Sequence, residues 1–570
     1  MTRHATLLVA LGLVAGCATP ARQPAQAPAG GESNARATTL AGRSTVYAPR
    51  AGIATSHPLA SAAALEVLQR GGNAVDAAVT AAAVLTVVEP HMTGIGGDMF
   101  ALVWLAGERR LIGINASGRS GSLMTREELG RRGHTSVPLF GVESVTVPGT
   151  LSGWAMLLER FGSIPLARAL EPAIRLADEG FPVSQIIADQ WEAEAERLRG
   201  DEGARSTFLV DGMRAPHAGE WFRNPDFART LRTVASEGPG AMYGGTLGRR
   251  IADHMREHGG FLTIEDLRHH RAREVTPISA SFRGHRVWQL PPNNQGIAVL
   301  EMLRILEPFD LRAMGHNSVG YLHHLVEAKK LAFADLNRYV GDPEHMPVPV
   351  DRLLTDEFIA ERRARLDPHR AAERQEPGGA ITQSETIYLS AADGEGNMIS
   401  LINSNYWEFG SGVVVPGTGF VLQNRGAGFT LEPGRANTVA PRKLPFHTLI
   451  PGFVTRTVGG AEEPWLSYGV MGGAMQPQGH VQLLLNLIVF EMELQTAIDA
   501  PRFRHTSGVR VAIEEPVPDA VRDGLRAMGH DVREGSTQPW GFGGAQVVMR
   551  LPRGWALGSD PRKDGQAVGW

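Results

Sequence analysis

The fold is decided by one stretch, Gln383-Ser-Glu-Thr-Ile-Tyr-Leu-Ser-Ala-Ala-Asp393, which continues Gly-Glu-Gly-Asn-Met-Ile-Ser-Leu-Ile-Asn403. Residues 386–392 are β-prone and largely apolar, residues 393–397 have turn chemistry, and residues 398–403 are again β-prone. Two such runs around an Asp/Gly/Asn turn predict a β-hairpin.

Thr386 stands at the start of this hairpin, directly after a polar run with Pro and Gly (367–384) that has neither helical nor strand periodicity. This pattern suggests a place where the chain is cut. A cut before Thr386 would put a hydroxyl and a free amine on one residue, a combination that forms an activated nucleophile. The alternative is a β-branched residue that simply favours a strand.

Composition excludes several classes of function. The chain has 570 residues, a nearly balanced formal charge of −4 and no long basic run, which argues against nucleic acid as a main partner. Its single cysteine excludes disulfides, a thiolate nucleophile downstream and cysteine-based metal sites. The sequence contains no G-x-S-x-G, H-E-x-x-H or Walker A motif. The adjacent histidines at 269–270 and 323–324 are interpreted as surface or core residues, so no metal is expected.

The N-terminus has the pattern of a targeting signal. A basic end is followed by a short apolar run and by Val14-Ala-Gly-Cys17, which resembles the bacterial lipobox. Residues 1–17 are therefore predicted to be a lipoprotein signal with lipidated Cys17, and residues 18–40, rich in Pro and Ala, a flexible tether. We expect a lipid-anchored protein on the periplasmic side of a bacterial envelope, in the outer membrane. An ordinary secretory signal is the alternative.

The remaining sequence predicts an α+β fold in which sheets pack between helices. Helices are expected at 59–70, 76–88, 247–258, 264–269, 297–306, 316–338, 353–365 and 480–490. Strands are expected at 99–105, 110–114, 278–282, 286–289, 386–392, 398–403, 509–513, 545–549 and 555–557.

Two later stretches suit a nucleophile at Thr386. The return strand of the hairpin leads to Ser404, whose hydroxyl could hydrogen-bond the threonine oxygen. Gly472 and Gly473 precede a predicted helix and would expose adjacent backbone N–H groups. Such donors can hold the oxyanion of an acyl-transfer intermediate. The plainer interpretations are a polar strand end and a tight strand-to-helix turn.

These residues belong to a longer series of motifs that resembles the γ-glutamyltransferase (γ-glutamyltranspeptidase, glutathione hydrolase) family of N-terminal nucleophile hydrolases. The motifs, in order, are Ala54-Thr-Ser-His-Pro58, Gly71-Gly-Asn-Ala-Val-Asp-Ala-Ala78, Thr93-Gly-Ile-Gly-Gly-Asp98, Val147-Pro-Gly149, Asp335-Leu-Asn-Arg-Tyr-Val-Gly-Asp-Pro343, Glu385-Thr-Ile-Tyr-Leu-Ser390, Gly472-Gly473, Asp499-Ala-Pro-Arg502 and Gly558-Ser-Asp-Pro-Arg562.

The resemblance implies an αββα sandwich made as an inactive precursor that cuts itself before Thr386. A large chain (41–385) and a small catalytic chain (386–570) would stay associated. Thr386 would attack a γ-glutamyl carbonyl, Gly472 and Gly473 would hold the oxyanion, and the acyl group would pass to water or to an amino-acid or peptide amine. The resemblance implies no metal or organic cofactor.

Several positions depart from the family pattern. The arginine that binds the substrate α-carboxylate falls on Ser117, with Arg119 two residues on. Arg425 and Gly428 stand where the family has a glutamine and an acidic residue for the α-ammonium. The other substrate-binding positions of the family correspond here to Tyr406, in place of an asparagine, and to His447 and Thr448, in place of paired serines.

The sequence therefore leaves three hypotheses. One is hydrolysis or transfer of γ-glutamyl amides such as glutathione. The second follows from charge: Arg119 and Arg425 favour an acyl donor with a carboxylate and disfavour an ammonium, as in a glutaryl-type amide. The third is an unprocessed, non-catalytic envelope lipoprotein.

We predict that the purified protein runs as two bands on a denaturing gel, because the Thr386 hydroxyl attacks the preceding peptide bond. N-terminal sequencing of the smaller band should read Thr-Ile-Tyr-Leu, and Thr386→Ala should leave one full-length band. A single band that Thr386→Ala does not change would favour the non-catalytic hypothesis.

Overall fold

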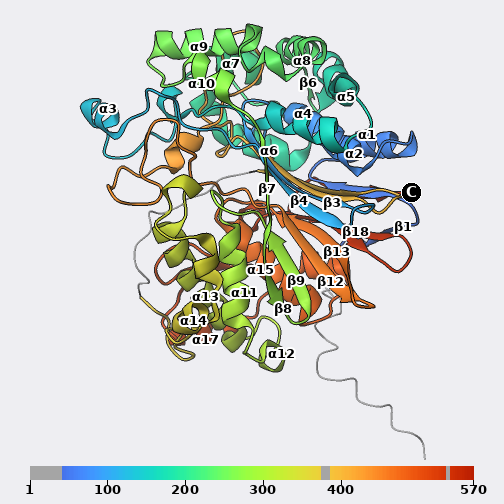
Figure 1. The fold of residues 1–570 in the computed structure, drawn as a ribbon, viewed down its shortest axis with the longest axis vertical. Helices are drawn as coiled ribbons and strands as arrows, with labels where there is room; N and C mark the ends of the chain where they lie inside the picture. Colours follow the sequence, from blue (N-terminus) through green and yellow to red (C-terminus); the bar gives the residue numbers. More distant parts are fainter. Residues whose placement is uncertain (1–41, 374–385, 535–538) are drawn as a thin grey trace, which may run out of the picture.

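The computed structural model describes residues 42–373, 386–534 and 539–570. The predicted signal with Cys17, the tether, and residues 374–385 before Thr386 lie outside the described residues. Within these ranges the fold is the predicted αββα sandwich: two seven-stranded sheets lie face to face between layers of helices (Figure 1). None of the helices in these ranges has the length and apolar composition needed to cross a bilayer.

Both sheets are antiparallel throughout. The hairpin sheet contains, in spatial order, β19 (Gln566–Gly569), β2 (Gly52–Thr55), β10 (Ile387–Ala392), β11 (Met398–Ser404), β3 (Asp98–Leu105), β4 (Arg110–Asn115) and β7 (Arg273–Val275). The second sheet contains β1 (Val46–Ala48), β18 (Trp555–Ser559), β17 (Ala545–Arg550), β13 (Ala461–Val470), β12 (Gly452–Val458), β9 (His285–Gln289) and β8 (Ile278–Phe282). Smaller sheets are formed by β14 (Phe503–His505), β15 (Arg510–Ile513) and β16 (Asp531–Glu534), and by β5 (Phe181–Pro182) and β6 (Trp221–Phe222).

Helices cover the outer face of each sheet (Figure 1). Above the hairpin sheet lie α1 (Pro58–Gln69), α2 (Ala74–Val88) and α4 (Thr150–Phe161), with α5 (Leu166–Glu179) and α8 (Pro225–Glu237) outside them. The second sheet is covered by α11 (Gly296–Leu306), α15 (Met475–Ile488) and α16 (Leu494–Asp499), with α13 (Val319–Tyr339) packed on α11. The other α-helices are α3 (Arg126–Arg131), α6 (Gln185–Leu198), α7 (Glu202–Phe208), α9 (Thr246–His258), α10 (Ile264–His269), α12 (Leu311–Met314), α14 (Asp356–Arg363) and α17 (Asp519–Ala527).

The central strands are apolar on both faces because each face is covered. Along β10, Ile387 and Leu389 pack into the core beneath α2, whereas Tyr388 packs into the core between the sheets. The same alternation runs along β3, where Phe100 points between the sheets and Met99 toward the helices. A fully buried side chain of this size contributes about 1.5–3 kcal/mol relative to exposure. This double burial fixes the register, since a slip by one residue would exchange the two faces.

The turn of the hairpin is tied to α2. The Asp393 carboxylate accepts hydrogen bonds from the backbone N–H groups of Glu395 and Asn397 inside the turn, both at 3.0 Å. It also accepts from the Ala74 N–H at the start of α2. The helix itself begins at a capping box formed by Asn73 and the third helical residue. The far end of the hairpin is therefore held, and the strand ends at Thr386 and Ser404 are placed accordingly.

Most predicted elements are confirmed, but some boundaries are wrong. The helix expected at 316–338 begins only at Val319, because Asn317 has a positive φ and the Ser318 side chain caps the helix. The helix expected at 480–490 begins five residues earlier, at Met475, since its first turn is polar yet buried. Helix α8 was missed although Asn224, followed by proline, supplies an N-cap signal.

Candidate active site

Thr386 lies immediately before β10 and is fully buried, with 0% of its surface exposed. In the hairpin register Ile387 is opposite Asn403, so Thr386 comes opposite Ser404. The Thr386 Oγ1 hydroxyl donates to Ser404 Oγ at 3.2 Å, as the sequence predicted. The nucleophile candidate and its partner are thus brought together by strand pairing.

Ser404 connects the threonine to the next predicted residue. Its Oγ also accepts a hydrogen bond from the Tyr406 backbone N–H at 2.8 Å. Tyr406 has φ +83°, which is uncommon for a residue other than glycine, and its ring lies 4.0 Å from the guanidinium carbon of Arg425. Such a cation–π contact is worth about 2 kcal/mol when it is desolvated. The strained turn therefore places an aromatic face against the buried cation.

Arg425 begins a short 3₁₀ turn (Arg425–Gly428) and has 0% exposure. Its Nη1 donates to Thr448 Oγ1 at 3.0 Å, whereas Nε and Nη2 have no hydrogen-bond partner within the described ranges. Burial lowers the pKa of Arg425 to about 10, against the influence of Tyr406 and Asp98, so the group is charged at neutral pH. A buried cation with unused donors favours an anionic ligand, because leaving it unpaired is costly.

A buried pair, Asp98 and His447, lies beside this cation. His447 Nε2 donates to Asp98 Oδ2 at 2.9 Å, and the Gly118 N–H donates to Asp98 Oδ1 at 2.9 Å. Burial raises the pKa of Asp98 to about 7, opposed by the charge of Arg425. Burial and the same arginine hold the pKa of His447 well below its usual value. His447 is therefore neutral. Its Nδ1 accepts a long, 3.4 Å hydrogen bond from the Leu449 N–H, so both ring nitrogens have partners within the protein. A role for His447 in binding substrate stays a prediction.

The predicted glycine pair lies between β13 and α15. Gly472 has φ +111° and Gly473 φ +57°, in the left-handed region where a side chain would be strained. The carbonyl of Gly472 accepts from Met475, and that of Gly473 accepts from Gln476. The N–H groups of the two glycines donate to no other residue of the described part. Their role as an oxyanion hole stays a prediction.

Gln295 completes the arrangement and was not predicted. Its Nε2 donates to the Gly473 carbonyl at 2.8 Å and to the Thr448 carbonyl at 2.7 Å. It therefore joins the glycine pair to the residue that holds Arg425. The contacts run from Thr386 through Ser404, Tyr406, Arg425, Thr448 and Gln295 to Gly473. The sequence signal was a turn, Pro291-Pro-Asn-Asn-Gln-Gly296, which by itself did not identify a site residue.

Arg119 lies outside this series of contacts. Its Nη1 donates to Asp342 Oδ2 at 3.0 Å and to the Arg442 carbonyl at 2.9 Å, and the side chain is 32% exposed. It lines a separate pocket of about 180 Å³. The series of contacts that begins at Thr386 therefore reaches Arg425 and not Arg119. A role for Arg119 in substrate binding stays a prediction.

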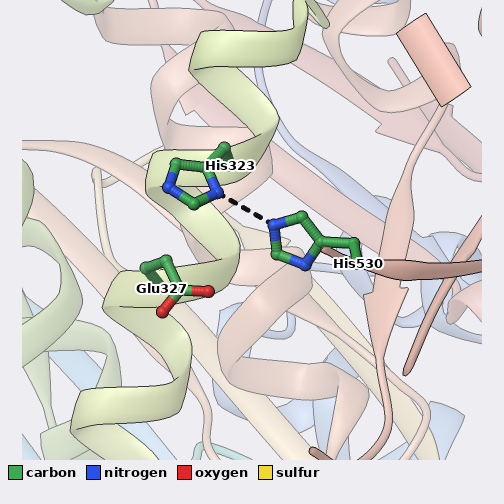
Figure 2. A group of neighbouring side chains, drawn as sticks. All are labelled: His323, Glu327 and His530. Carbon is green, nitrogen blue, oxygen red and sulfur yellow. Dashed lines mark hydrogen bonds between the residues drawn. The ribbon is translucent and has the colours of Figure 1, made fainter. Parts of the chain in front are cut away.

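One group of side chains has the composition of a metal site. Figure 2 shows His323 and Glu327 of α13 beside His530, all buried, with ligand-type atoms within 4.8 Å of one another. The two imidazoles share a 2.9 Å hydrogen bond, and Lys330 Nζ donates to Glu327 at 2.7 Å and to the Ala372 carbonyl at 3.0 Å. Because a lysine neutralises the carboxylate, we interpret this as a structural cluster that holds residue 372 against α13.

A buried threonine at the start of a central strand in an αββα sandwich is the arrangement of N-terminal nucleophile hydrolases. The chain belongs to the gamma-glutamyltranspeptidase family, whose sequence profile matches residues 60–570.

Relatives within this family differ in the amides that their names specify. The chain is 37% identical over 527 residues to the glutathione hydrolase-like YwrD proenzyme of Bacillus subtilis, covering 91% of this chain and 98% of the relative. It is 38% identical to the oxamate amidohydrolase proenzyme of Klebsiella pneumoniae, covering 90% and 97%. Among solved structures, the cephalosporin acylase from Bacillus halodurans matches with a TM-score of 0.88 and 42% identity, covering 94% of this chain and 98% of that one. The acyl donor must therefore be argued from the site.

We predict that Ser404→Ala slows both precursor cleavage and turnover by roughly 10–100-fold. It removes the acceptor of the Thr386 hydroxyl and of the Tyr406 N–H, and an unsatisfied buried donor costs about 1–3 kcal/mol. Gel densitometry of cleavage and kcat measure the effect. Ser404→Thr keeps the hydroxyl and is the matched control. Equal rates for Ser404→Ala and the unchanged protein would contradict this role.

Proposed function

We propose that this chain is a self-processing amide hydrolase whose acyl donors carry a carboxylate and no ammonium, as glutaryl-type amides do. The observation that carries the proposal is the fully buried Arg425, with two unused N–H donors, joined through Tyr406 and Ser404 to the Thr386 hydroxyl. A planar guanidinium with two free donors matches the two oxygens of a carboxylate.

The charges at the site argue against an ammonium group on the acyl donor. Gly428, at the position of the family's acidic residue, has no side chain to offer. Asp98, a buried carboxylate close by, is held by His447 and Gly118, and its pKa is raised to about 7. An ammonium placed here would face Arg425 in a desolvated environment, where like charges repel strongly.

The reaction follows from the two functional groups of an N-terminal threonine. In the precursor, Oγ1 of Thr386 attacks the carbonyl carbon of Glu385, the peptide C–N bond breaks as its nitrogen is protonated, and water hydrolyses the resulting ester. The freed α-amine, with a reference pKa near 8, then serves as the base for Oγ1.

Each substrate amide is attacked in the same way. Oγ1 forms a bond to the acyl carbon, and the N–H groups of Gly472 and Gly473 donate to the oxyanion, each donor being worth about 3–4 kcal/mol. The amine leaves with the proton taken from Oγ1, and water hydrolyses the acyl ester. An amine in place of water would give transfer.

The relatives support this proposal in chemical terms. Oxamate, named for the Klebsiella pneumoniae relative, is an amide with a carboxylate and no ammonium. The second candidate is cleavage of γ-glutamyl amides such as glutathione, which the family membership favours. The lipid anchor at Cys17 and the envelope location remain predictions from the N-terminal sequence.

We predict a higher kcat/KM for glutaryl-4-nitroanilide than for γ-glutamyl-4-nitroanilide, and that Arg425→Gln lowers the glutaryl value at least roughly 30-fold. Truncating a buried partner of a charged group costs about 2–5 kcal/mol, and each 1.4 kcal/mol lowers kcat/KM about tenfold. Release of nitroaniline by the processed protein gives both constants, and oxamate and a succinyl anilide extend the series to shorter acyl groups.

Arg119→Gln is the matched control, because Arg119 is an arginine with carboxylate partners outside the contacts around Thr386. It should keep the glutaryl preference. Preference for γ-glutamyl, or an Arg425→Gln variant as active on the glutaryl substrate as the unchanged protein, would refute the proposal.

A further inference from the structure

The pocket lined by Arg119 lies at the same end of the hairpin sheet as Thr386. Ser404, beside Thr386, pairs with Asp98 at the start of β3, and the end of β4, Asn115, pairs with Arg273 of β7. Neighbouring strands are about 4.8 Å apart, so β4 lies roughly 14 Å and β7 roughly 19 Å from β10 across the sheet. Arg273 of β7 and residues that follow β4 line the pocket, so we take this range as the approximate separation of the pocket from the nucleophile across the sheet.

The side chains that line the pocket carry more positive than negative charge. Its volume is about 180 Å³, and its charged lining residues are Arg119, Arg271, Arg273, Arg442 and Asp266. The carboxylate is already used: Asp266 Oδ2 accepts from the N–H and hydroxyl groups of Ser122, both at 2.9 Å, and Oδ1 from Arg442 at 3.3 Å. Asp266 therefore offsets little of the charge of the four arginines. Of these, Arg119 is also paired with Asp342 and Glu344.

Two lining side chains have unused hydrogen-bonding groups. The Arg273 guanidinium makes no hydrogen bond or salt bridge with another residue of the described ranges. His270 Nε2 is buried and likewise has no partner there. Burial, together with the charges of Arg273, Arg271 and Arg119, lowers the pKa of His270 to about 3. Burial also lowers the pKa of Arg273, as does the charge of Arg119, whereas Asp342 and Glu344 act in the opposite direction. Burial is the main cause of both shifts, and the neighbouring arginine charges, which an anion would offset, add to it.

We propose that this arginine-lined pocket binds a carboxylate carried by the amine half of the amide substrate, with Arg273 as its principal partner. The inference rests on the proposed function and extends it to the second half of the substrate. The acyl carboxylate cannot reach the pocket, because in a glutaryl group it lies within about 6 Å of the amide carbon, given C–C bonds of about 1.5 Å.

The distance indicates the length of the amine half. An extended peptide advances about 3.3–3.6 Å per residue, so three to five residues span the roughly 14–19 Å from Thr386 to the pocket. A peptide with a free C-terminal carboxylate has the required chemistry. Arginine forks bind such carboxylates with two parallel hydrogen bonds.

The test uses glutaryl-peptides of one to six glycines, each made with a C-terminal carboxylate and with a C-terminal carboxamide. Release of the peptide amine by the processed protein is followed chromatographically. We expect the ratio of kcat/KM for carboxylate over carboxamide to be near one for a single glycine and to rise to about tenfold at three to five glycines.

Arg273→Gln should return this ratio to one at every length while leaving hydrolysis of glutaryl-4-nitroanilide unchanged. Arg110→Gln, at the opposite end of β4 and half exposed, is the matched control and should keep the length-dependent ratio. Self-cleavage and the melting temperature of each variant report folding, and Arg273→Lys, which retains the charge, should keep part of the effect.

The two proposals fail in different ways. A ratio of one at all lengths in the unchanged protein, with glutaryl-peptides still hydrolysed, overturns the pocket inference alone. A carboxylate preference that Arg273→Gln leaves intact also overturns it. If glutaryl-peptides of every length resist hydrolysis, both the pocket inference and the proposed acyl specificity are overturned.

Discussion

The antiparallel pairing of β10 with β11 sets the positions of Thr386 and Ser404, from which the other contacts of the site extend. Because the two strands are buried on both faces, their register cannot shift without exposing one set of apolar side chains to the wrong layer. The same pairing places Thr386 opposite Ser404 and leaves their hydroxyl oxygens 3.2 Å apart. Asp393 anchors the other end of the hairpin to α2. The core therefore supplies the precision that a nucleophile requires, since this part of the site lies on strands and not on loops.

In the proposed function, the charges around this fixed pair select the acyl group. Arg425 is kept charged although it is buried, and Tyr406 and Thr448 satisfy only part of it. The neighbouring Asp98 is held by the neutral ring of His447, so it is poorly placed to neutralise a second cation. The guanidinium of Arg425 thus lacks a counter-charge of its own, and a substrate carboxylate would supply one. Binding energy gained there can orient the amide for attack by Thr386.

The sequence predicted the layers, the hairpin and the partnership of Thr386 with Ser404, because all of these follow from strand periodicity and from motifs near one another in the chain. It also located the glycine pair, since a strand-to-helix turn with two glycines is a local signal. It could not show that Gln295 joins the glycines to Thr448, because that contact spans more than 150 residues. Nor could it separate Arg425 from Arg119, because charge alone does not reveal which arginine already has carboxylate partners.

The sequence also could not predict the hydrogen bond between His530 and His323, which are 207 residues apart in the chain. Adjacent histidines in the sequence gave no indication of this buried cluster, whose members come from α13 and from the segment before β16. Long-range side-chain contacts of this kind depend on how the layers are packed. They are fixed by the tertiary structure and leave no periodic trace in the sequence.

In the proposed reaction, the Thr386 hydroxyl attacks the acyl carbon while Arg425 holds a carboxylate of the same substrate. The most direct test of this reaction is labelling of the processed protein with an activated phosphonate ester that carries a glutaryl-length carboxylate, followed by mass spectrometry. The account predicts one phosphonyl group per molecule, attached to Thr386 of the small chain, with labelling slowed by Arg425→Gln. A label on another residue, or no label on the small chain, would contradict it.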